Sequence, residues 1–204
     1  MKLYNSIGPN PKMVRIFAAE LGQTLDMVDV DLMAGENRGD DFAKKNARGQ
    51  LPALELDDGS TLAEITAICE YLAEKAGGSS LIGTTPEERA QTRMWTRRAD
   101  LYVCEPLANG FRFAEGLPLF EKRMLCRPEA ADGLKAMAKN GLEWFETVMQ
   151  DGRDWLAGSR FSMADVLLFA FLEFGATVGQ PIPDTCPKLT AWYDRTAARP
   201  SAEA

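Results

Sequence analysis

The sequence contains no histidine, which removes the commonest general base and the commonest nitrogen ligand of zinc. Its four cysteines are far apart and form no closely spaced pair of the kind found in zinc or redox motifs. Any catalysis therefore proceeds without a serine–histidine or cysteine–histidine pair. We interpret the cysteines as reduced, mostly buried thiols: Cys69, Cys104, Cys126 and Cys186.

A basic surface and a long apolar run are also missing. The net charge of −7 argues against a nucleic-acid partner, because phosphates attract a basic face. No apolar run approaches the roughly 18 residues that a membrane span needs, and polar residues and Gly-Pro interrupt the N-terminus where a signal peptide would be apolar. With 46% hydrophobic residues, the composition predicts a cytoplasmic globular protein with a full core and no membrane contact.

Strand and helix patterns alternate in the first part of the chain. Apolar runs at 2–6 and 26–32 and a hairpin at 53–62 predict strands. Amphipathic stripes at 11–21 and 64–76 predict helices.

The order of these patterns predicts an α/β domain over 1–76. Within it, the charged segment 38–45 is interpreted as a solvated face with one loose helix. A glycine- and serine-rich linker follows at 77–86. The remainder, 87–204, shows only helical patterns and predicts an all-α domain.

Two signals place helices in the second domain. A long helix is predicted from Pro86 to about Ala114, bent at Pro106. Ser162 and Asp165 stand three residues apart before an apolar run, which predicts a capping box and gives Asp165 a structural role.

Two patterns in the first domain offer main-chain groups to a ligand. In "GQLPAL", a cis Leu51–Pro52 bond would leave the N–H and C=O of Leu51 free to pair with an extended peptide, whereas a trans proline is commoner. In "LAEITAICEYL", Glu64 opens a helix, either as a cap or as a partner for a ligand ammonium. The N–H groups of Ile65 and Thr66 could then hold a ligand carboxylate. From the residues alone, both pairs of alternatives stay open.

Four stretches, in register over essentially the whole chain, resemble the glutathione S-transferase family: "LYNSIGPNPKMVRI", "GQLPALELDDGSTLAEITAICEYL", "FSMAD" and "PKLTAWYDRTAARP". The resemblance implies a thioredoxin-like α/β N-terminal domain that binds glutathione, followed by an all-helical domain, with a homodimer as the assembly. Glutathione is the implied cosubstrate, and no metal is implied.

The resemblance also implies roles for single residues. It implies that Pro52 is cis and that Leu51 pairs with the cysteinyl backbone of glutathione. Glu64 and the N–H of Ile65 would hold the γ-glutamyl group. The glutathione-binding residues that it implies are Asn10, Gln50, Leu51, Pro52, Glu64, Ile65 and Thr66.

One departure from the family concerns the residue after Glu64. The family commonly has a serine there, whose hydroxyl bonds to the γ-glutamyl carboxylate, but this chain has Ile65. Loss of such a charge-assisted bond costs about 1.5–3 kcal/mol. Backbone amides or Thr66 must replace it, or the affinity for glutathione is modest.

A larger departure lies in the opening loop. Many members place a serine, cysteine or tyrosine there to activate the glutathione sulfur, whereas this chain has Gly8, Pro9 and Asn10. Tyr4 and Ser6 lie in the predicted strand, before the loop. The Pro-Asn pair is similar to the Nu-class and Ure2p-like transferases, which use an asparagine near the sulfur and often reduce disulfides.

Two roles of Asn10 are compatible with the sequence. Its side-chain amide can donate to a thiolate at the positive end of the first helix, which lowers the pKa of the thiol from about 8.5. Alternatively, it is the N-cap of a helix that begins at Pro11. The two readings carry equal weight.

The acceptor pocket is expected between this loop and the long helix. Arg98 and Tyr102, four residues apart on one helical face, are the candidates. Aromatic residues at such spacing, Trp95 and Tyr102 among them, are more often core.

The sequence thus predicts a glutathione transferase or a disulfide reductase in which a glutathione thiolate attacks an electrophile or a disulfide. The alternative is a non-catalytic module that binds glutathione or a protein. An isomerase or dehalogenase on the same scaffold is a third hypothesis.

Overall fold

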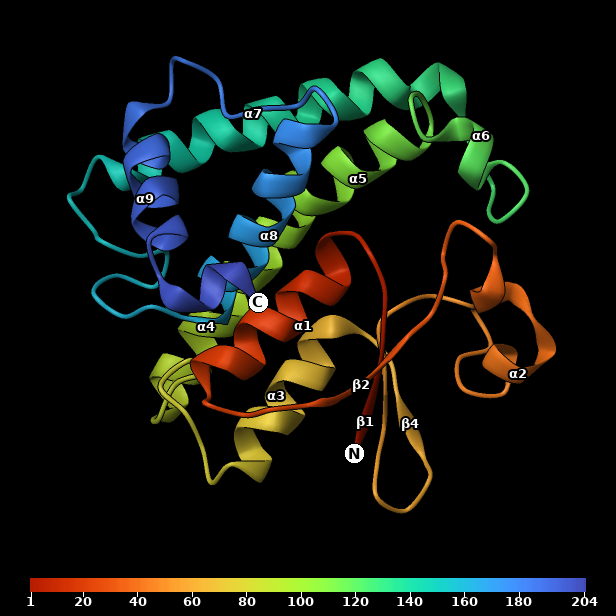
Figure 1. Cartoon of the computed structure of the whole chain (residues 1–204). Coiled ribbons are helices and arrows are strands. Elements are labelled where there is room, and N and C mark those ends of the chain that lie inside the picture. Colours follow the sequence, from red (N-terminus) through yellow and green to blue (C-terminus); the bar gives the residue numbers. More distant parts are fainter. The chain divides into compact units, whose positions relative to one another are not determined.

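The computed structural model describes all residues from 1 to 204. The chain forms two compact units, the first made of Met1–Ser79 with Pro200–Ala204 and the second of Ser80–Arg199 (Figure 1). The last five residues, which the sequence pattern groups with the helical region, thus group with the first unit. There, the Ser201 hydroxyl donates a hydrogen bond to the Glu20 carboxylate. None of the helices combines the length and the apolar character that crossing a membrane requires.

The first unit is built on a four-stranded mixed sheet with the order β2-β1-β3-β4. The strands are β1 Lys2–Asn5, β2 Asp26–Asp29, β3 Ala53–Glu55 and β4 Thr61–Leu62. β1 pairs in parallel with β2, and the other two pairings are antiparallel. Consequently the C-terminal ends of β1, β2 and β4 and the N-terminal end of β3 lie at the same edge of the sheet.

Four helices accompany the sheet, and a fifth short one ends the chain. They are α1 Pro9–Glu20, η1 Glu36–Arg38, α2 Asp40–Ala43, α3 Ile65–Lys75 and η4 Pro200–Glu203. α1 and α3 pack side by side on one side of the sheet, and α2 lies on the other (Figure 1). The apolar stripes predicted for both long helices are confirmed, because Met13, Phe17, Ile68 and Leu72 are fully buried.

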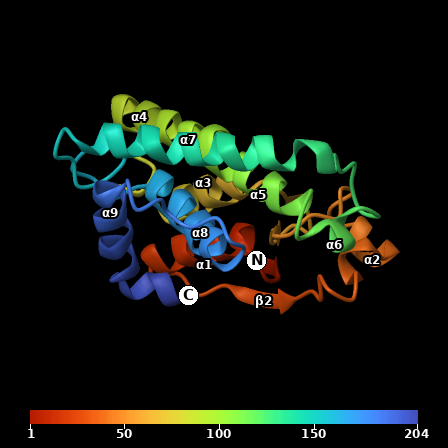
Figure 2. The ribbon, with the colours of Figure 1, turned by 90° about the horizontal axis from the view of Figure 1, so that it is seen from above.

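The second unit is all-helical, as the sequence pattern predicts. Its elements are α4 Pro86–Ala99, η2 Asp100–Cys104, α5 Glu105–Arg112, α6 Leu117–Phe120, η3 Pro128–Ala130, α7 Ala131–Met149, α8 Met163–Thr177 and α9 Pro187–Ala197. α7 runs along α5 and η2 (Figure 2). The short helices α6 and η3 are too brief to give a periodic signal in the sequence.

The predicted bend at Pro106 takes the form of a π-helical turn, η2, between α4 and α5. Proline has no N–H, and its ring crowds the carbonyl four residues earlier, so the ladder of helix hydrogen bonds is interrupted near Tyr102. α7 approaches closely there. A Cβ built on Gly141 would lie 2.2 Å from the Tyr102 carbonyl oxygen, and only glycine permits this contact.

The carboxylate of Asp165 is fully buried at the start of α8, the buried central helix of the second unit. It accepts a hydrogen bond from the Ser162 N–H at 2.9 Å, as the capping box predicts, and a further one from the Ser162 hydroxyl at 2.8 Å. It also accepts from the Leu156 N–H at 2.8 Å and the Trp192 indole N–H at 2.9 Å. Desolvation raises the pKa of Asp165, and these donors oppose the rise. Its role is structural.

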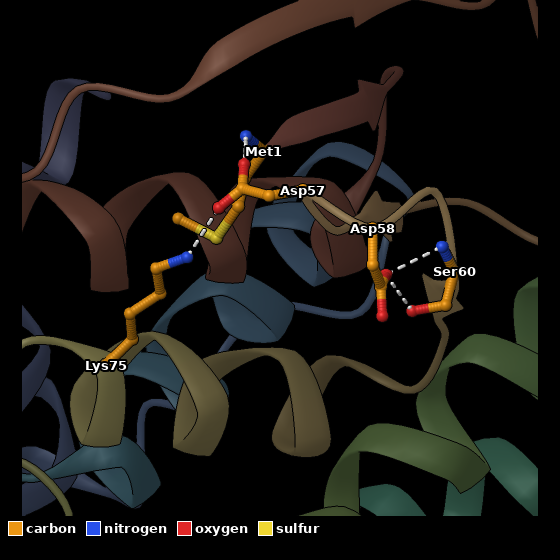
Figure 3. Close-up of polar contacts among 5 residues, drawn as sticks. All are labelled: Met1, Asp57, Asp58, Ser60 and Lys75. Carbon is orange, nitrogen blue, oxygen red and sulfur yellow. Dashed lines mark hydrogen bonds and ion pairs between the residues drawn. The ribbon is translucent and has the colours of Figure 1, made fainter.

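A charged cluster holds the turn of the β3–β4 hairpin (Figure 3). The Asp57 carboxylate accepts from the Lys75 ammonium at 2.7 Å and from the α-ammonium of Met1 at 2.6 Å. Asp58 accepts from the N–H of Ser60 at 2.9 Å and from its hydroxyl at 2.6 Å. The hydrogen bond from Lys75, followed by that from Met1, lowers the pKa of Asp57 from 3.8 to about 2.

This pKa shift predicts how the stability of the protein depends on pH. The carboxylate of Asp57 stabilises the folded state fully above pH 3.8, and the stabilisation is lost as the pH falls through about 2. We expect Asp57→Asn to lower the thermal midpoint slightly at pH 7, because the group is exposed, and to converge with the wild type near pH 2. Asp26→Asn, at an exposed aspartate whose side chain makes no hydrogen bond or ion pair, is the control for thermal unfolding followed by circular dichroism. Equal midpoints for the two variants at pH 7 would contradict the prediction.

Candidate functional site

The site is assembled at the sheet edge where β1, β2 and β4 end and β3 begins. Register pairs Tyr4 with Ala53 and Leu54 with Leu62, so the loop after β1, the segment before β3 and the segment after β4 adjoin one another. Each of these three segments carries main-chain groups that find no partner within the chain.

The first segment leads into α1, which begins at Pro9 rather than Pro11. The N-cap is Gly8, with φ of 102°, and no side chain caps the helix. The alternative in which Asn10 is the N-cap is therefore wrong. Both prolines fit inside the first turn, because the N–H groups that they lack would have no helical partner there.

This arrangement gives Asn10 a distinct position. Pro9 and Pro11 have no N–H, and the Lys12 N–H already donates to the Gly8 carbonyl at 3.3 Å. Within the first turn, the Asn10 N–H is thus the one remaining helix donor. The side-chain amide of Asn10 is half-buried and has no hydrogen-bond partner in the protein. Asn10 offers both amides to a ligand at the positive end of α1.

The nearby hydroxyl groups are already engaged. The Tyr4 hydroxyl donates to the Glu55 carboxylate at 2.9 Å, and its ring packs edge-on against Phe42 with centroids 5.8 Å apart. The Ser6 hydroxyl donates to the Val30 carbonyl at 2.7 Å. Neither hydroxyl is therefore free to donate to a ligand at the loop. This agrees with their positions in the chain, before the loop begins.

The second segment precedes β3. The Leu51–Pro52 peptide bond is cis, which confirms what the resemblance implies and excludes the trans alternative. The Leu51 side chain packs against the small cluster of Val30, Phe42 and Ala53. Neither the N–H nor the C=O of Leu51 has a hydrogen-bond partner within the chain.

The Gln50 side chain is exposed beside this pair of groups and has no partner either. The residues just before Leu51 are held by side chains that sequence reasoning missed. Three consecutive carbonyls accept from three side-chain donors: Arg48 from Arg38 at 3.2 Å, Gly49 from Asn37 at 2.6 Å, and Gln50 from Asn46 at 2.9 Å.

The interpretation of 38–45 as a solvated face is therefore only partly right. Phe42 is buried, and Lys45 forms an ion pair with Glu55. No sequence signal marks Asn37, Arg38 and Asn46 as the residues that hold this segment, since polar side chains in an irregular segment have no periodicity.

The third segment is the start of α3. Glu64 has φ of 67° and ψ of 117° and is the one non-glycine residue of the chain with positive φ. Its carboxylate is exposed and makes no hydrogen bond. The first helical bond runs from the Ile68 N–H to the Glu64 carbonyl at 3.0 Å, so the N–H groups of Ile65, Thr66 and Ala67 remain without partners.

These features make the start of α3 suited to a zwitterion. The three free N–H groups and the helix dipole favour a ligand carboxylate. The free carboxylate of Glu64 favours an ammonium close by. The Thr66 hydroxyl also has no partner in the protein, so it can donate where Ile65 cannot.

The chain supplies no thiol of its own to this edge. All four cysteines are free, and Cys69 on α3 is fully buried. Burial raises the pKa of the Cys69 thiol well above its usual range. Nowhere do three or more Cys, Asp or Glu side chains gather in a way that could hold a metal ion.

Arg98 and Tyr102 lie together in the second unit, around Trp144 of α7. The Arg98 guanidinium stands 4.8 Å from the Trp95 ring centroid and 5.7 Å from that of Trp144. The Tyr102 ring meets Trp144 edge-on at 5.4 Å. Trp95 is buried, as expected for a residue of the core. Tyr102 remains 45% exposed. The acceptor-pocket role of Arg98 and Tyr102 stays a prediction.

Comparisons with known proteins agree with this architecture. The family model "Glutathione S-transferase, N-terminal domain" matches residues 1–74, and "Glutathione S-transferase, C-terminal domain" matches residues 126–200. "Glutathione S-transferase 2" of Saccharomyces cerevisiae is 37% identical over 96% of this chain and 84% of its own length. "Glutathione S-transferase GstA" of Escherichia coli O157:H7 is 31% identical over 100% of this chain and 96% of its own.

Solved structures give the same result. The crystal structure of Gtt2 from Saccharomyces cerevisiae superposes with a TM-score of 0.93 at 37% identity, covering 100% of this chain and 99% of that one. A glutathione S-transferase domain-containing protein from Marinobacter aquaeolei VT8 also gives 0.93, at 38% identity, covering 99% of this chain and 100% of its own. The thioredoxin-like α/β domain followed by an all-helical domain, which the resemblance implies, is confirmed.

The strained backbone at Glu64 leads to a prediction about stability. A non-glycine residue in such a conformation costs on the order of 1–3 kcal/mol, and glycine is free of most of this strain. Since the Glu64 side chain is exposed and makes no hydrogen bond, we expect Glu64→Gly to raise the free energy of unfolding by about 1 kcal/mol. Glu64→Ala, which keeps the strain, is the matched control in urea unfolding. A glycine variant less stable than the alanine variant would contradict this account.

Proposed function

Because the chain belongs to the glutathione S-transferase family, we propose that it binds glutathione at the sheet edge of the first unit and uses the bound sulfur as a nucleophile. In a transfer reaction, the thiolate forms a bond to an electrophilic carbon while the leaving group departs with the bonding electron pair. In a disulfide reduction, the thiolate attacks one sulfur, a mixed disulfide with glutathione forms, and the other sulfur leaves as a thiolate.

The observation that carries this proposal is the set of unpaired groups on three adjoining segments. The free N–H and C=O of Leu51 match the main chain of the cysteinyl residue, as a further strand would. The start of α3 matches the two charges of the γ-glutamyl group, with Glu64 on the ammonium and the N–H groups of Ile65 and Thr66 on the carboxylate. In this proposal the exposed Gln50 lies beside the tripeptide, and the buried Pro52 supports the segment from below.

The departure at Ile65 is compensated in this arrangement. Where relatives of the family have a serine hydroxyl, the free Thr66 hydroxyl one residue later takes over the hydrogen bond to the γ-glutamyl carboxylate. Glutathione binding then uses main-chain donors together with the side chains of Glu64 and Thr66.

We assign Asn10 to the sulfur. Its N–H and its side-chain amide are both without partners, and both lie in the first turn of α1. Two donors and the helix dipole stabilise a thiolate more than a thiol, and this difference lowers the pKa of the sulfur. No general base is needed, because water accepts the proton. This account fits a chain that has no histidine and no free hydroxyl at the loop.

Substitution of Asn10 tests the assignment. We expect Asn10→Ala to raise the pKa of bound glutathione by about one unit, since one donor to the thiolate is lost. Asn10→Asp should raise it further, because a carboxylate repels the thiolate. The measurement is the ultraviolet absorbance of the thiolate during a pH titration of the protein saturated with glutathione. Ser6→Ala, whose hydroxyl is engaged with Val30, should titrate as the wild type does. An unchanged titration in Asn10→Ala would remove Asn10 from the reaction.

Turnover separates catalysis from simple binding. The absence of a free hydroxyl at the opening loop favours, as a second candidate, a member of the family that binds glutathione or a protein without catalysis. Steady-state assays with a chloro-arene and with a small glutathione-containing disulfide distinguish the two. Activity on either compound supports the transferase or the reductase, and inertness toward both, with glutathione bound, supports the binder.

We further propose a homodimer in the cytoplasm. The free state of all four cysteines suits a reducing compartment. Large apolar side chains of α4, η2 and α7 are exposed, and we infer that they form one dimer face: Met94, Leu101, Tyr102 and Met137. Such a patch marks an interaction surface. Arg98 lies over the Trp144 ring and Tyr102 meets it edge-on, which supports a role of both at this face rather than in the acceptor pocket.

The dimer proposal predicts an effect of a charge on this face. Leu101 is 44% exposed, and a glutamate there would be buried without a partner in the dimer. We expect Leu101→Glu to shift the molar mass in light scattering after size exclusion from twice that of the chain to that of one chain. Leu125→Glu, at a leucine that is 70% exposed outside this face, is the control. A wild-type protein that runs as a monomer would overturn the proposal.

A further inference from the structure

Asn37 is a buried polar side chain that packing does not explain. It is 2% exposed, and its amide N–H donates to the Gly49 carbonyl at 2.6 Å. A carbonyl oxygen can only accept, so the amide must turn its nitrogen toward Gly49. Its own oxygen is then buried without a donor. An apolar side chain of similar size would avoid this unfavourable state, so the hydrogen bond to Gly49 is the reason for an asparagine here.

Both the side chain and the main chain of Asn37 lie against Gly49. Gly49 adopts φ of 61°, and a Cβ built on it would lie 2.8 Å from the main-chain oxygen of Asn37 and 3.2 Å from the Arg38 side chain. Only glycine fits between these groups. Main chain and side chain of Asn37 therefore both touch Gly49, and they fix its peptide unit relative to η1.

Gly49 stands two residues before Leu51, whose N–H and C=O are unpaired. An irregular segment with unpaired main-chain groups samples several orientations unless other bonds hold it. In this segment, the side chains of Asn37, Arg38 and Asn46 supply those bonds, and of the three only Asn37 is fully buried.

We propose that Asn37 is a positioning residue for glutathione, a role that rests on the proposed function. Because it is buried, Asn37 does not touch the tripeptide; it acts through Gly49, whose fixed carbonyl sets the orientation of Gln50 and Leu51 before the ligand arrives. Without this bond, glutathione has to order the segment as it binds, which weakens the affinity. The sulfur lies at Asn10, on a different segment, so the rate at saturating glutathione is preserved.

The test compares two amide side chains with the same bonding pattern. Gln23 also donates one bond to a carbonyl, that of Leu72 at 3.3 Å, and also leaves a buried oxygen unpaired. We expect Asn37→Leu to raise the Kd and the KM for glutathione roughly five- to tenfold, the loss that one hydrogen bond represents, with kcat changed by less than about twofold. Gln23→Leu should leave all three unchanged. Isothermal titration calorimetry gives the Kd, and steady-state kinetics give the KM and kcat.

Thermal unfolding of both variants separates positioning from general destabilisation. Equal glutathione affinity in Asn37→Leu and Gln23→Leu would overturn the positioning role, even if Asn37→Leu is less stable. Should Asn37→Leu not fold, Gly49→Ala tests the same contact from the other side, because its Cβ forces the two segments apart. Unchanged affinity in Gly49→Ala overturns the proposal. A wild-type protein that does not bind glutathione overturns the proposed function itself, and the positioning role with it.

Discussion

Main-chain N–H and C=O groups must find partners within the chain or face solvent and ligand, and the sheet edge of the first unit is where this chain leaves them unpaired. The cause differs at each segment. Two prolines in the first turn of α1 leave the Asn10 N–H as the one helix donor there. The segment at Leu51 reaches no neighbouring strand, and α3 begins without a side-chain cap at Glu64. In the proposed function, these unpaired main-chain groups are the ones that bind the polar tripeptide.

Keeping such groups available has a structural cost that is visible elsewhere in the unit. Glu64 is held in a strained conformation although its side chain is exposed and makes no hydrogen bond. Asn37 keeps a buried oxygen unpaired in order to hold Gly49. Strain and unpaired groups of this kind gather at functional sites, because the rest of the fold is stable enough to carry them. In the second unit, by contrast, the four donors around Asp165 are all satisfied, as expected for a residue with a purely structural role.

Features that rest on short-range interactions were predictable. The capping box of Ser162 and Asp165 depends on three residues of spacing, and the apolar stripes of α1 and α3 depend on the helical period. The N-cap of α1 was not, because Pro9 and Pro11 both suit a first helical turn and the residues do not say which one begins it. The π-helical turn at η2 was expected only as a bend, since its form depends on the approach of α7 at Gly141.

The amino-acid sequence by itself determined the order of strands and helices, the absence of imidazole chemistry and the residues that resemble a glutathione site. Tertiary structure alone decided which polar groups are free to act. The hydroxyls of Tyr4 and Ser6 are engaged by Glu55 and Val30, while Asn37 holds Gly49 from twelve residues away. The physical reason is range: propensity and periodicity act over a few residues, whereas a hydrogen-bond partner far along the chain is fixed only when the chain folds.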